Sequence, residues 1–161
     1  MTTYLPTAFR KARVLLFTLA LFMMGGCDSD GHSEDDEIMV SRFGESESHN
    51  AGRNCINCHQ SGGGGEGVFV VAGTVYKDDG VTINPGTVVR IYTEPNEQGV
   101  VLVSLEVDDR GNFYTTEQLD LQDGRYVSVS AGVTTRMMIS AVTGGACNSC
   151  HGNNVEVIKA P

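Results

Sequence analysis

The stretch "VFVVAGTVYK", residues 68–77, decides the fold. It is rich in β-branched and aromatic residues, which pack well on a pleated surface and favour a strand. The sequence "DDG" follows it directly and marks a turn, and "NPG" at residues 84–86 marks another. We therefore predict that a β-strand begins this part of the chain.

Similar short segments follow as far as residue 141. Apolar residues alternate in several of them; Val127, Val129 and Ala131, for example, share one face. No segment is long and helical, and turn sequences such as "PNEQG" and "DDRG" lie between segments. These patterns predict a mainly β fold, a small antiparallel β-sandwich over residues 68–142. The predicted strands are residues 68–77, 87–93, 100–107, 112–115, 125–131 and 134–141.

Four short motifs carry a resemblance to a known family. They are "GTVY" from residue 73, "GTVVRIY" from residue 86, "DRGNFY" from residue 109 and "GRYVSV" from residue 124. Together they resemble the transthyretin-like, carboxypeptidase-regulatory-type β-sandwich family. Because these motifs hold turn and core positions, the resemblance implies a sandwich fold and no particular chemistry.

One five-residue pattern occurs on both sides of this region, as "CINCH" at residues 55–59 and "CNSCH" at residues 147–151. Two cysteines separated by two residues and followed at once by histidine form the attachment pattern for c-type haem. The two thiols can form thioethers with the haem vinyl groups, and the imidazole can then ligate the iron. We therefore predict two covalently bound c-type haems. The predicted haem-binding residues are Cys55, Cys58 and His59 for the first and Cys147, Cys150 and His151 for the second.

Two other kinds of site would also use these cysteines. The four thiols could form a zinc site, but that would leave both histidines unexplained and would put thiolates in an oxidising compartment. Each pair could instead be a disulfide-redox site, but no βαβ context for such a motif is visible. The haem interpretation uses every residue of both patterns.

The second axial ligand of each iron is harder to predict. His49, six residues before Cys55, is the nearest candidate for the first haem; the alternative is a solvated histidine. Met138 is a candidate to cap a haem that lies on the sheet, because it is predicted to share a face with Arg136; the alternative is a surface methionine. Met137, on the opposite face, is predicted to belong to the core.

The first 26 residues have the features of an export signal. A basic region at residues 10–13 precedes "VLLFTLALFMM", residues 14–24, which has the length of a signal-peptide core and is too short for a membrane span. Small residues before Cys27 resemble the bacterial lipoprotein signal, in which the cysteine is lipidated, although Met24 stands where that family usually has leucine. The alternative is an ordinary signal peptide and a free thiol. We expect a protein exported to the cell envelope and anchored through lipid at Cys27.

Charge and composition bound the remaining segments. The net charge is −9, and removal of three basic residues with the signal makes it −12, which argues against nucleic-acid binding and suits a basic redox partner. Residues 27–50 are acidic and are predicted to be a disordered tether. Residues 51–67 carry the first motif and "SGGGGEG", which is predicted to be a flexible linker. Residues 143–161 carry the second motif and the C-terminal tail.

The strand count predicts where the two motifs lie. Consecutive antiparallel strands reverse direction, so six strands would place Val68 and Ala141 at the same end of the sandwich and make the two haems neighbours. A seventh strand in residues 117–122 would send them to opposite ends.

These features predict electron transfer by a dihaem c-type cytochrome. No cluster of acid, base and nucleophile indicates an enzyme. The two motifs and the lipoprotein-like signal resemble the small envelope cytochromes of metal- or sulfur-respiring bacteria, which implies other redox proteins or multihaem cytochromes as partners. The alternatives are a haem-based redox or gas sensor and a structural or binding sandwich that haem staples.

Overall fold

The computed structural model describes residues 37–161. The predicted signal peptide, Cys27 and the first part of the acidic segment lie outside the described residues. Within residues 37–161 no helix has the length and apolar character needed to cross a membrane.

The described chain is built from strands and two short 3-10 turns. The turns are η2 (Cys55–Asn57) and η3 (Cys147–Ser149). The strands are β1 (Val71–Tyr76), β2 (Val88–Tyr92), β3 (Val101–Glu106), β4 (Asn112–Thr115), β5 (Tyr126–Ala131), β6 (Thr134–Met137), β7 (Gly145–Ala146) and β8 (Ile158–Lys159).

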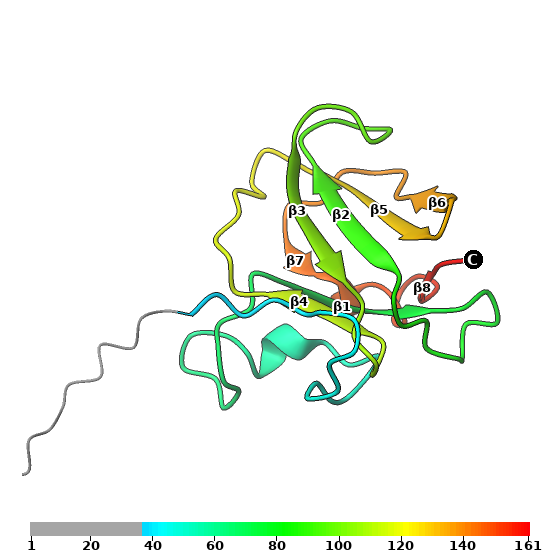
Figure 1. The fold of residues 1–161 in the computed structure, drawn as a ribbon. Coiled ribbons are helices and arrows are strands. Elements are labelled where there is room, and N and C mark those ends of the chain that lie inside the picture. The colour runs from blue at the N-terminus through cyan, green and yellow to red at the C-terminus, as the bar shows by residue number, and fades with distance from the viewer. Residues whose placement is uncertain (1–36) are drawn as a thin grey trace, which may run out of the picture. The chain divides into compact units, whose positions relative to one another are not determined.

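Two sheets form the fold, as predicted. Sheet 1 has the order β4-β1-β7, and β8 also pairs with β1; sheet 2 has the order β3-β2-β5-β6. In Figure 1 the strands of sheet 2 run across those of sheet 1. Neighbours are antiparallel except that β7 and β8 pair with β1 in parallel. The molecule is therefore a mainly β, two-layer structure with a small β-sandwich core.

All six predicted strands occur, and residues 117–122 form none. Two strands were not predicted, β7 and β8. Each has only two residues, which is too short for apolar alternation to register. β7 lies directly before the CxxCH segment at residues 147–151, and β8 lies after it. Because both strands pair with β1, they hold this segment against β1. The predicted last strand, residues 134–141, ends early at Met137.

The core lies between the sheets, with β1 at its centre. Val71 and Val75 of β1 are 1% and 0% exposed, and Phe113 of β4 and Leu105 of β3 are equally buried. The neighbouring side chain Thr74, which points to the other face of β1, is also fully buried. A strand covered on both faces has no alternation, which explains the almost continuous apolar run in this segment.

The expectation that Met137 belongs to the core is wrong. Its side chain is 48% exposed, and Ile139 and Val133 beside it are fully exposed. The segment forms the edge of sheet 2, so no second layer covers this face of β6.

The predicted tether is also corrected over its described part. Residues 37–50 do not hang free but follow the edge of sheet 1: Val40 bridges to Thr115, and the Ser41 amide donates to the Tyr114 carbonyl at 3.0 Å. Ser41 is 1% exposed, and its hydroxyl donates to the Glu106 carbonyl at 2.7 Å. Polar residues can be buried here because their hydrogen bonds are satisfied.

Candidate functional site

The two CxxCH segments adopt the same backbone turn. We call residues 55–59 the first motif and residues 147–151 the second motif. In the first, the amides of Cys58 and His59 both donate to the Cys55 carbonyl, at 3.1 and 3.0 Å. In the second, the corresponding two amides donate to the carbonyl of the leading cysteine at 3.3 and 3.0 Å. Each turn thus places two thiols and an imidazole at fixed positions around one short loop.

The imidazole of His59 is held on several sides. Its Nδ1 lies 2.6 Å from the Glu66 carbonyl oxygen. A carbonyl can only accept, so Nδ1 carries the proton and Nε2 of the neutral ring keeps its lone pair. The ring stacks on Phe69 with centroids 4.0 Å apart and an angle of 4° between the planes, and Phe69 stacks in turn on Tyr114.

The glycine-rich segment is part of this site and not a free linker. The Gly65 amide donates to the Cys58 carbonyl at 3.0 Å, so the loop folds back over the motif. A side chain at Gly65 would come within 2.8 Å of the His59 ring. The expectation of a flexible linker over residues 61–67 is therefore wrong: these glycines allow the loop to close on the histidine.

His151 repeats the arrangement in the second motif. Its Nδ1 lies 2.7 Å from the Glu156 carbonyl oxygen, so Nδ1 of this ring also carries the proton and Nε2 of the neutral ring keeps its lone pair. A second-shell hydrogen bond from the other ring nitrogen is the usual companion of a metal-ligating histidine. Both His59 and His151 make this hydrogen bond, each in its own loop.

His49 lies beside His59. The two ring centroids are 6.0 Å apart, with the planes tilted by 39°. The next residue, Asn50, adopts a left-handed φ of 55°. The buried side chain of Asn112 donates to the His49 carbonyl at 3.2 Å and to the Ser48 hydroxyl at 2.9 Å. A buried residue of β4 therefore fixes the backbone that carries His49.

A cavity of about 840 Å³ adjoins the second motif. We call it the second-motif cavity. Cys147, Cys150 and His151 all line it, and its apolar wall includes Phe113 of sheet 1 and Val129 of sheet 2. The volume lies within the range of about 300–1,000 Å³ that is typical of cofactor sites. Met138, the sequence candidate for a distal ligand, lines the same cavity, as does Met137.

The leading cysteine of each motif lies where burial disfavours a thiolate. All four thiols of the motifs are free, and burial raises the pKa of Cys55 and raises that of Cys147 to about 12. Reactive and metal-binding cysteines need a thiolate, which lowered pKa values provide. Within residues 37–161 no group of three or more histidine, cysteine or acidic side chains converges as metal ligands.

Both motifs lie against the middle of β1. On one face, η2 of the first motif contacts β1, and the amide of Gly52, three residues before the motif, donates to the Thr74 hydroxyl at 2.8 Å. On the other face, Cys147 packs over Gly73. A Cβ atom added at Gly73 would lie 3.0 Å from the Cys147 Cβ, so glycine leaves room for the cysteine. Neighbouring haems remain a prediction, but its basis changes, because the motifs flank one strand and do not hang from one end of the sandwich.

Several residues of these sites could not be found from the sequence. The carbonyls of Glu66 and Glu156 are backbone groups, and their roles are independent of residue type. Phe69 lies in the quoted strand segment and reads as a core residue, which it also is, at 8% exposed. The feature that the two sites share is a loop after each CxxCH in which a carbonyl, five to seven residues after the histidine, accepts its hydrogen bond. Only this recurrence could have indicated the two carbonyls.

Comparisons with protein-family models, with curated proteins and with solved structures gave no match. The resemblance to the transthyretin-like family therefore remains a prediction, while the two-sheet fold itself is observed.

Proposed function

We propose that this chain is a dihaem c-type cytochrome that transfers electrons in the bacterial cell envelope. Cys55 and Cys58 would bind one haem covalently with His59 as iron ligand. Cys147, Cys150 and His151 would do the same for the second. The function requires export, and the anchor would be lipid on Cys27, which lies outside the described residues.

One observation carries the proposal. Two separate loops have the same CxxCH turn, and in both the histidine Nδ1 donates to a backbone carbonyl, at 2.6 and 2.7 Å. This fixes the tautomer and directs Nε2 as the ligand atom. Within the described residues neither Nε2 makes a hydrogen bond.

For the first haem we propose His49 as the second axial ligand. Two imidazole nitrogens on opposite sides of one metal ion, each about 2 Å from it, would lie about 4 Å apart, which would put their ring centres roughly 6 Å apart. The observed 6.0 Å between His49 and His59 matches that separation. Two strong nitrogen ligands leave no open position, which suits electron transfer and disfavours gas binding at this site.

The chain's own residues define what each site does. The bound haem supplies one-electron ferric–ferrous chemistry. The hydrogen bond to His59 and its stacking on Phe69 hold the ring in one orientation, which keeps reorganisation on electron exchange small. Phe113 and Val129 give the second-motif cavity an apolar wall, and apolar surroundings would shift the reduction potential of a haem bound there. The first site is therefore characterised by a stacked, hydrogen-bonded histidine and the second by an apolar cavity.

A sensor and a haem-stapled binding module remain the alternatives. Met137 and Met138 both line the second-motif cavity, so a sulfur ligand for that iron is available. If neither methionine binds, the second site would have the open position that a sensor needs. The proposed partners are other redox proteins or multihaem cytochromes of the envelope, with basic surfaces that complement the net charge of −9.

Absorption spectra of the purified holoprotein test the proposal. Electron transfer predicts two low-spin haems that are reduced by dithionite, reoxidised by ferricyanide and unchanged by carbon monoxide. A Gln98→Ala variant serves as the control, because its side chain is exposed between β2 and β3 and does not line the second-motif cavity. A ferrous spectrum that shifts in carbon monoxide would instead favour the sensor.

A further inference from the structure

The second-motif cavity has an apolar interior and two cations at its rim. The interior includes Val89, Phe113 and Val127, and the cations are Arg136 and Lys159. Among the lysines and arginines that the structure describes, these two line the cavity. This pairing fits a flat apolar ligand that carries acidic groups along one edge.

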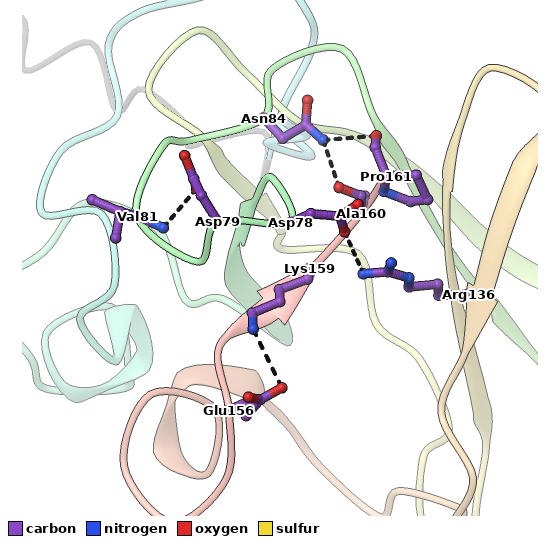
Figure 2. A network of polar contacts seen from close by, with 9 residues as sticks. All are labelled: Asp78, Asp79, Val81, Asn84, Arg136, Glu156, Lys159, Ala160 and Pro161. Atoms are coloured by element: carbon purple, nitrogen blue, oxygen red, sulfur yellow. Dashed lines mark hydrogen bonds and ion pairs between the residues drawn. The ribbon is translucent and has the colours of Figure 1, made fainter.

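The two cations lie at the same part of the rim. Arg136 pairs with Asp78 at 2.7 Å, and Asp78 belongs to the turn after β1. Lys159 lies against Gly80 of that same turn, and a side chain at Gly80 would be 3.6 Å from the lysine Nζ. Figure 2 shows Arg136 reaching toward Asp78, and Lys159, on β8, reaching toward Glu156.

The present partners of these cations are easily exchanged. The side chain of Asp78 is 62% exposed, and that of Glu156, 3.4 Å from the Lys159 nitrogen, is 83% exposed. Exposed ion pairs contribute little to stability because water and salt screen them. Both cations are therefore free to bind carboxylates that enter the cavity, at small cost.

We propose that the second-motif cavity holds the second haem with its two propionates against Arg136 and Lys159. The inference rests on the proposed function, because it assumes covalent attachment through Cys147 and Cys150. It adds the orientation of the haem: the apolar ring lies between the sheets, and the carboxylates lie beside the turn after β1.

The consequence is electrostatic. A ferric haem carries one positive charge more than a ferrous haem, so nearby cations favour the ferrous state. The cations also compensate the propionate charges. Removal of Arg136 and Lys159 should lower the midpoint potential of the second haem and leave that of the first nearly unchanged.

The test is a spectroelectrochemical titration of the full-length holoprotein carrying Arg136→Gln and Lys159→Gln. Variants lacking Cys147 and Cys150 identify which wave belongs to the second haem. The matched control is Arg42→Gln with Arg110→Gln, which removes two exposed cations outside the cavity. A charge-preserving pair, Arg136→Lys with Lys159→Arg, should restore the potential.

A lower potential for the second wave alone, restored by the charge-preserving pair, is the expected result. No change, or an equal change in both waves and in the control, would overturn the propionate assignment while leaving two covalent haems in place. Protein without covalent haem would end the proposed function and this inference together. Two haems per chain and an unchanged far-ultraviolet spectrum show that the variant is folded.

Discussion

Two adjacent glycines give a sharp test of how the second motif is held. Gly145 of β7 pairs in parallel with Val71 of β1. A methyl group at Gly145 would collide with the Val70 carbonyl oxygen and lie 2.7 Å from the Val71 Cα. These are backbone atoms and cannot rotate away. At Gly144, one residue earlier, a side chain would meet nothing within 4 Å.

The expected effects therefore differ strongly between neighbours. Gly145→Ala must push β7 away from β1, and overpacking of this kind costs about 1–3 kcal/mol in the free energy of unfolding. With a urea m-value of roughly 1–3 kcal/mol per molar, the midpoint should fall by about 1 M. Gly144→Ala should change the free energy of unfolding by less than about 0.5 kcal/mol. Urea unfolding followed by circular dichroism measures both.

The second motif should respond along with the fold. Because Cys147 follows β7 directly, a displaced strand moves the thioether attachment and should broaden or shift the second haem's absorption band in Gly145→Ala. Equal urea midpoints for the two variants would refute the reasoning, because they would mean that β7 does not pack on β1.

Four further predictions follow from the sites. His49→Ala should convert one haem from low spin to high spin, whereas Ser46→Ala, whose side chain is exposed, should leave both spectra unchanged; an unaltered His49→Ala spectrum would exclude the histidine as a ligand. In protein made without haem, the free energy of unfolding should fall between about pH 9 and 12. The reason is that the Cys147 thiol keeps its proton in the folded state up to a pKa of about 12 and ionises near 9.0 when unfolded. Haem-bearing protein, in which this sulfur is a thioether, should lack that loss in urea titrations at pH 8 to 10. Gly65→Val should disturb the first haem and spare the second, since the side chain would press on the His59 ring; equal disturbance of both bands would contradict the closed-loop geometry. Cys27→Ser should move the protein from the membrane fraction to the soluble fraction, and continued membrane association on fractionation would show that another element anchors it.

The sequence predicted the strands well for a physical reason. β2, β3 and β5 each have one face on the core, so their apolar residues alternate and can be recognised in a single sequence. β7 and β8 are held by hydrogen bonds to β1 and not by a pattern of their own. Two-residue strands of this kind depend on a partner that is distant in sequence.

The site was predictable only in its covalent part. The CxxCH residues follow from spacing, because thioether chemistry fixes the distance between the thiols. The burial of Ser41 and the ordered path of residues 37–50 depend on hydrogen bonds to Tyr114 and Glu106, which acidic composition does not reveal. Arg136 of β6 and Lys159 of β8 lie at the same rim of the second-motif cavity because both contact the turn after β1. No local sequence motif indicates this contact.

The most direct test of the central claim is the intact mass of the mature protein from a host that matures c-type cytochromes. The account predicts a mass increase of two haems, and a loss of one in Cys55→Ala with Cys58→Ala. The corresponding pair at Cys147 and Cys150 should remove the other. A wild-type mass without any haem addition, or one that stays constant across these variants, would contradict the claim that both motifs bind haem.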